Sequence, residues 1–230
     1  MKREKLNCRF HEYLMSCDHV EDVDELDELF AKSDGTQSKK PDYFLANRAI
    51  ILEKKILLAD PYDKVVDYIR ELLDSDLEFL KVASVSHSIE EVFQRHPQGM
   101  SLKSKFLDKM YKGFRNNVMK PANKQLKNSS EHLGLNDAMK GVLLLNEDVD
   151  TFQHEHLVEE IQVQLTRKSE SEAIDFVILI SETEREKSNG GSSYSVIYSE
   201  SCDNIQYLKV RIENSLMLGW AAFSGSLVQR

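Results

Sequence analysis

Long apolar runs, paired cysteines and an excess of positive charge are all missing from this sequence of 230 residues. No apolar run approaches the roughly 20 residues that a membrane-spanning helix needs, and the opening MKREKLNCRFHEYL lacks the apolar core of a signal peptide. Cys8, Cys17 and Cys202 are odd in number and scattered, which argues against a disulfide-stapled secreted domain. The sequence therefore predicts a cytoplasmic protein without a membrane partner.

The formal net charge of -9 argues against a protein that coats nucleic acid nonspecifically, because such binding depends on Lys and Arg. The charge is distributed unevenly, however. Residues 18–28 contain seven acids and no Lys or Arg, whereas residues 101–130 contain a single acid, Asp108, and these bases: Lys103, Lys105, Lys109, Lys112, Arg115, Lys120, Lys124 and Lys127. Two interpretations are open. The acidic and basic segments are two solvated helix faces of opposite charge, or the basic segment is a local surface that faces phosphate groups.

Apolar spacing predicts an α/β protein. Val23, Leu26 and Phe30 indicate an amphipathic helix over 21–32, and residues 61–132 show helical spacing with a break at 96–99 and a new helix near Pro121. Short apolar runs predict strands at 141–146 and 175–181, joined through a helix in a parallel crossover. Further strands are expected at 194–198 and 205–212.

The segment Asp42–Leu58, DYFLANRAIILEKKILL, predicts a β-hairpin. If Asn47 and Arg48 form a two-residue turn, Asp42 lies directly opposite Glu53, and Lys55 points to the same side of the sheet. Two carboxylates at this spacing repel each other unless a cation lies between them, and hard oxygen ligands suit Mg²⁺ or Mn²⁺. The backbone carbonyl of Lys54 is a plausible further ligand.

Pro41-Asp42 followed by Glu53-Lys54-Lys55 at the end of an apolar strand resembles the motif of the PD-(D/E)xK nuclease superfamily. The resemblance implies metal ligation by Asp42 and Glu53 and catalysis by Lys55. It also implies an acid on the preceding helix and a polar residue on the helix that follows the motif strands. The candidates for these two positions are Glu28 in preference to Glu25, and Gln125 or Lys124.

The fold implied by this resemblance is a restriction-endonuclease-like mixed β-sheet core flanked by helices. One nuclease-like domain would then span residues 1–230, with residues 59–117 as a helical insertion that is longer than the simplest family members tolerate. Cys8, His11, Cys17 and His19 do not have the spacing of a zinc finger, and buried thiols with surface imidazoles explain them better.

The leading hypothesis is a Mg²⁺-dependent DNA endonuclease or related phosphodiesterase. A catalytically silent member of the same fold, acting as a nucleic-acid or protein-binding module, is the alternative. A third interpretation is a purely structural interaction protein that uses the acidic segment and the helical insertion as partner surfaces. An enzyme that cuts both strands is compatible with a homodimer, since two symmetric sites can address antiparallel strands.

Overall fold

The computed structural model describes residues 4–26, 30, 40–166, 173–184, 191–202 and 204–225. The chain divides into two compact units. The first unit comprises residues 1–58 and 118–230, and the second comprises residues 59–117, the segment that the sequence suggests as a helical insertion. No helix in the described ranges is long and apolar enough to cross a membrane.

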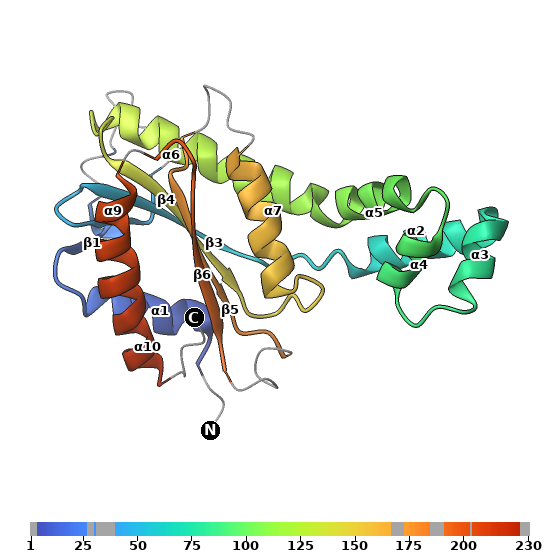
Figure 1. Ribbon diagram of the computed structural model, residues 1–230. Helices are drawn as coiled ribbons and strands as arrows, with labels where there is room; N and C mark the ends of the chain where they lie inside the picture. Colours follow the sequence, from blue (N-terminus) through green and yellow to red (C-terminus); the bar gives the residue numbers. More distant parts are fainter. Residues whose placement is uncertain are drawn as a thin grey trace. The chain divides into compact units, whose positions relative to one another are not determined.

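The first unit contains a mixed sheet, and in the part of the chain that the structure describes its six strands lie side by side in chain order (Figure 1). The strands are β1 (Val20–Asp22), β2 (Tyr43–Leu45), β3 (Ile50–Ile56), β4 (Met139–Asn146), β5 (Phe176–Ser181) and β6 (Ser193–Tyr198). β1, β2 and β3 pair antiparallel, β3, β4 and β5 pair parallel, and β6 returns antiparallel to β5. The sheet therefore combines a meander with parallel crossovers.

Helices flank this sheet. They are α1 (Leu6–Met15), α6 (Lys120–His132), α7 (His154–Thr166), α9 (Ile205–Leu208), the π-helical η4 (Lys209–Met217) and α10 (Leu218–Ser224), together with the short 3-10 helix η1 (Val23–Glu25). A further π-helical segment, η3 (Arg115–Met119), precedes α6. The two faces of the sheet have different helical covers, because successive strand residues point to opposite sides.

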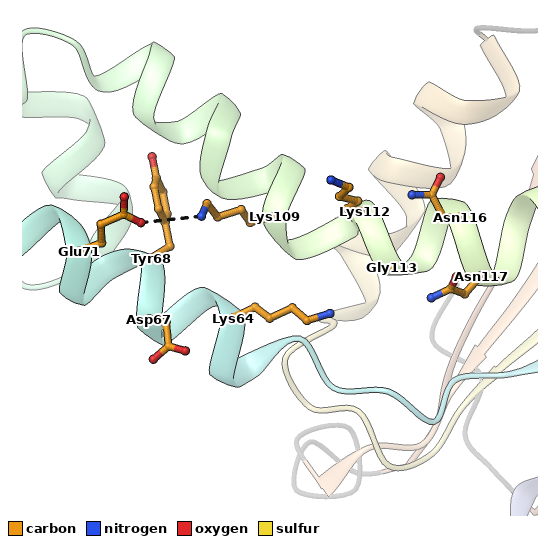
Figure 2. Close-up of a pocket in the computed structure, with 9 residues that line it drawn as sticks. All are labelled: Lys64, Asp67, Tyr68, Glu71, Lys109, Lys112, Gly113, Asn116 and Asn117. Carbon is orange, nitrogen blue, oxygen red and sulfur yellow. Dashed lines mark ion pairs between the residues drawn. The ribbon is translucent and has the colours of Figure 1, made fainter.

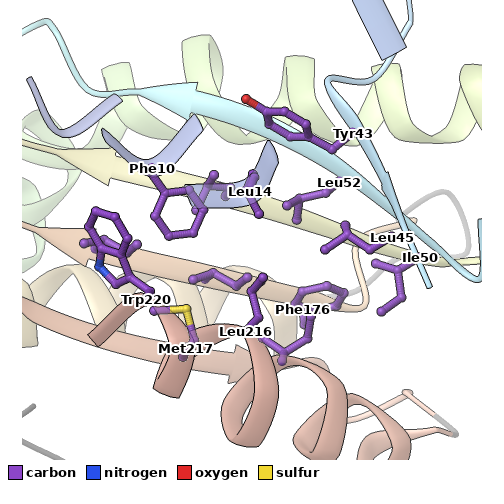
Figure 3. Packing of buried hydrophobic residues seen from close by; sticks show 14 of the residues in the cluster. Phe10, Leu14, Tyr43, Leu45, Ile50, Leu52, Phe176, Leu216, Met217 and Trp220 are labelled. Carbon is purple, nitrogen blue, oxygen red and sulfur yellow. The ribbon is translucent and has the colours of Figure 1, made fainter. Parts of the chain in front are cut away.

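The α1/α10 face carries the main hydrophobic cluster, in which Leu45, Ile50 and Leu52 of the hairpin pack with α1, η4 and α10 (Figure 3). Phe10 and Trp220 contribute an edge-to-face pair with ring centroids 4.9 Å apart. The opposite face, called the α6/α7 face, carries the alternate strand residues. His154 of α7 bonds there to Ser181 and Ser195, with nitrogen-to-oxygen distances of 2.9 Å in both cases.

Most predicted elements of the first unit are confirmed: the hairpin, the strands at β4, β5 and β6, and the parallel connection through α7. Two predictions are wrong. The acidic segment forms β1 and η1 instead of a helix over its described residues, because Val20–Asp22 pairs with the free edge of β2. The segment 205–212 is helical rather than a strand, and Leu208, Ile212 and Leu216 are buried at a spacing of four residues.

The second unit is a helical assembly of α2 (Tyr62–Ser75), α3 (Leu77–Ala83), α4 (Ile89–Arg95) and α5 (Gly99–Phe114). Phe79, Phe93 and Phe106 belong to its own hydrophobic cluster. Side-chain caps begin two of the helices: Asp76 accepts from the first-turn amides of α3, and Ser88 accepts from the Glu91 amide in α4. The predicted break between α4 and α5 is confirmed.

Candidate functional site

A tight turn sets the alignment of β2 and β3. The Ala49 amide donates to the Ala46 carbonyl across 3.3 Å, and the intervening Asn47 and Arg48 have φ values of 54° and 66°. Positive φ at both central residues is typical of a two-residue hairpin turn, although arginine rarely adopts it. Here Arg48 is held by an ion pair with Glu21, with 2.7 Å between Nη2 and Oε2.

The turn produces the predicted register. Tyr43 pairs with Leu52 as predicted. Asp42 lies just before β2 begins and not in a strand pair with Glu53, and its amide donates to the Leu52 carbonyl across 3.2 Å. Glu53 and Lys55 project from the α6/α7 face, because Leu52 belongs to the cluster on the other face, and the Asp42 carboxyl lies beside that of Glu53. The prediction that the hairpin brings these three side chains to one side is confirmed. Asp42 and Glu53 are called the carboxylate pair below.

Glu53 is the most perturbed member of this pair. Its residue is only 1% exposed, and burial together with the neighbouring Asp42 charge raises the pKa of its carboxyl to about 7. Its Oε1 accepts from the Lys55 ammonium, which partly counteracts that rise. Its Oε2 is buried and accepts from no donor among the described residues. When the Glu53 carboxyl is protonated, it can donate a hydrogen bond to the neighbouring Asp42 carboxylate, and this contact also raises the pKa of Glu53.

Asp42 is held by the backbone of the opposite strand. Its Oδ2 accepts from the Lys54 amide across 2.6 Å, and its own carbonyl accepts from the Val23 amide of η1 across 3.0 Å. Burial raises the pKa of Asp42, while the Lys54 amide and the two lysine charges lower it and the Asp24 charge raises it. Asp24 is therefore a member of the electrostatic surroundings that sequence reasoning missed, because the acidic segment was expected to be helical.

The two lysines of the motif have different surroundings. Lys55 pairs with Glu53, and its side chain is 24% exposed, so its ammonium group reaches solvent. Lys54 points to the other face, where its Nζ donates to the Tyr43 hydroxyl across 3.2 Å. Tyr43 also bonds to His11 Nδ1 across 3.0 Å. The Lys54 carbonyl stays a prediction as a metal ligand.

The helix that follows the motif strands lies close to the start of β2. Gln125 of α6 donates its side-chain amide to the Lys40 carbonyl, two residues before Asp42, whereas Lys124 is exposed. Of the two acids considered for the preceding helix, Glu25 is exposed in η1 and Glu28 lies outside the described residues. The catalytic role of Gln125 and the metal-ligating role of Glu28 stay predictions.

The carboxylate pair has the chemistry of a hard-cation site. Mg²⁺ or Mn²⁺ would stabilise the ionised form of two adjacent carboxylates, one of which has a buried oxygen that accepts no hydrogen bond from the part of the chain that the structure describes. Mg²⁺ is commonly held by only one or two carboxylates, together with water and substrate phosphate. Within the described ranges, which exclude Glu28, no group of three or more His, Cys, Asp or Glu side chains is arranged to hold a metal ion. The fit therefore rests on the pair.

Comparisons with known proteins do not assign the chain to a family: no protein-family model, no curated protein and no solved structure matches it.

Proposed function

We propose that this protein is a metal-dependent phosphodiester hydrolase that acts on DNA, with Mg²⁺ or Mn²⁺ held by Asp42 and Glu53. The observation that carries the proposal is the buried contact between these two carboxyl groups, with the Lys55 ammonium bonded to Glu53. Keeping two acids together in a buried position costs stability, and such a cost is typical of functional sites.

Each of these residues has a distinct chemical task. The two carboxylates would hold the cation as hard oxygen ligands. The bound metal would lower the pKa of a coordinated water and neutralise charge on the phosphate. The Lys55 ammonium, which reaches solvent, would orient the nucleophile or stabilise negative charge that develops on the phosphate oxygens. Gln125 would position the chain segment before Asp42 through its bond to the Lys40 carbonyl.

The architecture of the first unit supports a restriction-endonuclease-like version of this proposal. Its mixed sheet has helices on both faces, an antiparallel hairpin carries the motif, and α6 and β4 follow in the expected order. Residues 59–117 would be an insertion within one nuclease domain.

The proposal is tested by cleavage assays on single-stranded, double-stranded and branched DNA with Mg²⁺ or Mn²⁺. Asp42→Asn, Glu53→Gln and Lys55→Ala should each abolish cleavage while the fold persists, because each removes one charge at nearly constant backbone geometry. Glu12→Gln, at an exposed position of α1, is the matched control and should cleave normally. Equal cleavage by the wild type and all three site variants would refute the assignment.

A second test concerns DNA binding by the basic segment. Lys109 and Arg115 already pair with acids, at 3.9 Å from Glu71 Oε2 and 2.7 Å from Asp108 Oδ1, respectively. Replacing Lys109, Lys112 and Arg115 with Glu should weaken DNA binding and flatten its salt dependence, since fewer counterions are released. Lys81→Glu, in α3 of the same unit, is the control. An unchanged affinity and salt slope would remove this segment from the proposed interface.

The alternative function is a catalytically silent member of the same fold that binds nucleic acid or protein. It is favoured by the lack of a third metal-ligating side chain beside the pair within the described ranges. DNA binding without cleavage under every tested metal condition would support it. A homodimer stays a prediction, which sedimentation equilibrium with and without duplex DNA would test.

A further inference from the structure

The second unit contains a pocket of about 490 Å³ between α2 and the helical segment formed by α5 and η3 (Figure 2). This volume falls in the range of roughly 300 to 1,000 Å³ that is usual for small-molecule sites. All the residues that line the pocket lie between Lys64 and Asn117, so the second unit forms it alone.

The pocket exists because two facing helix stripes are polar where packed helices are usually apolar. On α2 the stripe comprises Lys64, Asp67, Tyr68 and Glu71, and on the opposite helical segment Lys109, Lys112, Gly113, Asn116 and Asn117. These positions recur at three- and four-residue intervals, which places each set on one helix side. Gly113 lies in the middle of its stripe, and a Cβ built there meets nothing within 4 Å. The glycine therefore leaves room for a ligand.

One end of the pocket carries positive charge that is not paired with an acidic side chain in the described ranges. The side chains of Lys64, Lys112 and Asn117 line this end of the pocket (Figure 2) and form no ion pair or hydrogen bond with any side chain that the structure describes. Two ammonium groups and an amide donor in one pocket match the oxygens of a phosphate group, which accept several charge-assisted hydrogen bonds.

The other end offers acceptors and an aromatic wall. Lys109 Nζ lies 4.7 Å from the Tyr68 ring centroid and 3.9 Å from Glu71 Oε2, which orients this lysine across the pocket. The Tyr68 hydroxyl is buried and has no hydrogen-bond partner among the described residues. Asp67 and Glu71 both line the pocket, and Asp67 also pairs with Arg70, with 3.3 Å between Asp67 Oδ1 and Arg70 Nη1. Each carboxylate has further oxygen lone pairs that can accept from ligand hydroxyl or amino groups.

We infer that this pocket binds a nucleotide, with its phosphate between Lys64 and Lys112 and its sugar hydroxyls or base amino group toward Asp67 and Glu71. The shared chemistry is a nucleoside phosphate, supplied either as a free nucleotide or as one unit of a nucleic-acid strand. The inference does not depend on the carboxylate pair, which lies in the first unit.

Titration calorimetry on the full chain, without divalent metal, tests this inference. The probes are the four 5′-ribomononucleotides, adenosine, inorganic phosphate and a short single-stranded DNA. Lys64→Ala and Lys112→Ala should each weaken nucleotide binding by about tenfold or more, the loss expected for one charge-assisted hydrogen bond. Lys105→Ala, at an exposed position of α5 outside the pocket, is the matched control and should bind normally.

Gly113→Leu tests the pocket with a variant that should lose nucleotide binding without losing stability. Leucine is a better helix former than glycine and meets open space here, so the melting temperature should not fall while the filled pocket loses its ligand. If Lys64→Ala, Lys112→Ala and Gly113→Leu lose binding of the mononucleotides, the ligand is a free nucleotide. If they lose only binding of the oligonucleotide, the ligand is one unit of a nucleic-acid strand.

Three results would overturn the inference. The first is a wild type that binds neither mononucleotides nor the oligonucleotide. The second is binding that Gly113→Leu leaves unchanged. The third is inorganic phosphate or adenosine binding as tightly as every nucleotide. Asp42→Asn should bind these probes like the wild type, so a failed nuclease assay and a failed binding assay remain distinguishable.

Discussion

The buried carboxyl of Glu53 makes the stability of the metal-free protein depend on pH. Its pKa is raised from an ordinary value of 4.5 to about 7. Between these values the folded protein holds a proton that the unfolded chain releases. Stability from this group is therefore fully present below about pH 4.5 and is lost as the pH rises through 7. Glu53→Gln replaces the ionising group with a neutral carboxamide that can donate to Asp42, as the protonated acid would.

The size of the effect follows from the pKa difference. At about 1.4 kcal/mol per pKa unit, the rise from 4.5 to about 7 corresponds to roughly 3 kcal/mol of destabilisation at pH 8. A chain of this length changes its melting temperature by about 2 to 4 °C per kcal/mol. Glu53→Gln should therefore melt several degrees above the wild type at pH 8, and close to it at pH 4.5.

The assay is thermal unfolding from pH 4.5 to 8.5 in chelator, repeated with Mg²⁺ at pH 8. At one hundred times its dissociation constant, Mg²⁺ should stabilise the wild type by about 2.7 kcal/mol and so raise its melting temperature. The melting temperature of Glu53→Gln should stay nearly unchanged. Glu12→Gln should follow the wild type throughout. A Glu53→Gln protein that is less stable than the wild type at pH 8, or that gains as much from Mg²⁺, would refute the reasoning.

Other measurements test neighbouring contacts. Lys55→Ala should move the loss of stability to higher pH, because the Lys55 ammonium lowers the pKa of Glu53; an unchanged profile of melting temperature against pH contradicts this. Asp24→Asn should lower the pKa of Asp42 in an NMR titration, because the Asp24 charge raises it, and a constant value would exclude that coupling. Gly141→Ala should cost about 1 to 3 kcal/mol in urea unfolding, because its Cβ would lie 2.2 Å from the Phe176 ring, whereas Gly113→Ala should cost nothing. Equal midpoints for the two glycine variants would show that the close approach at Gly141 is relieved without loss.

The sequence alone determined the register of the hairpin, and with it the meeting of Asp42, Glu53 and Lys55. This was possible because a two-residue turn and the alternation of side chains are local properties of a few consecutive residues. The buried strands β4 and β5 were predictable for a similar reason, since short apolar runs between turn residues suit a sheet covered on both faces.

Tertiary structure decided the features that depend on distant partners. Val20–Asp22 became a strand because β2 offers an unpaired edge, which no local pattern of acids reveals. The segment after Asn204 became helical because Leu208, Ile212 and Leu216 bury a common side against the sheet, which outweighed the β-branched residues within it. The raised pKa of Glu53 likewise results from burial, because only packing removes a charged group from water.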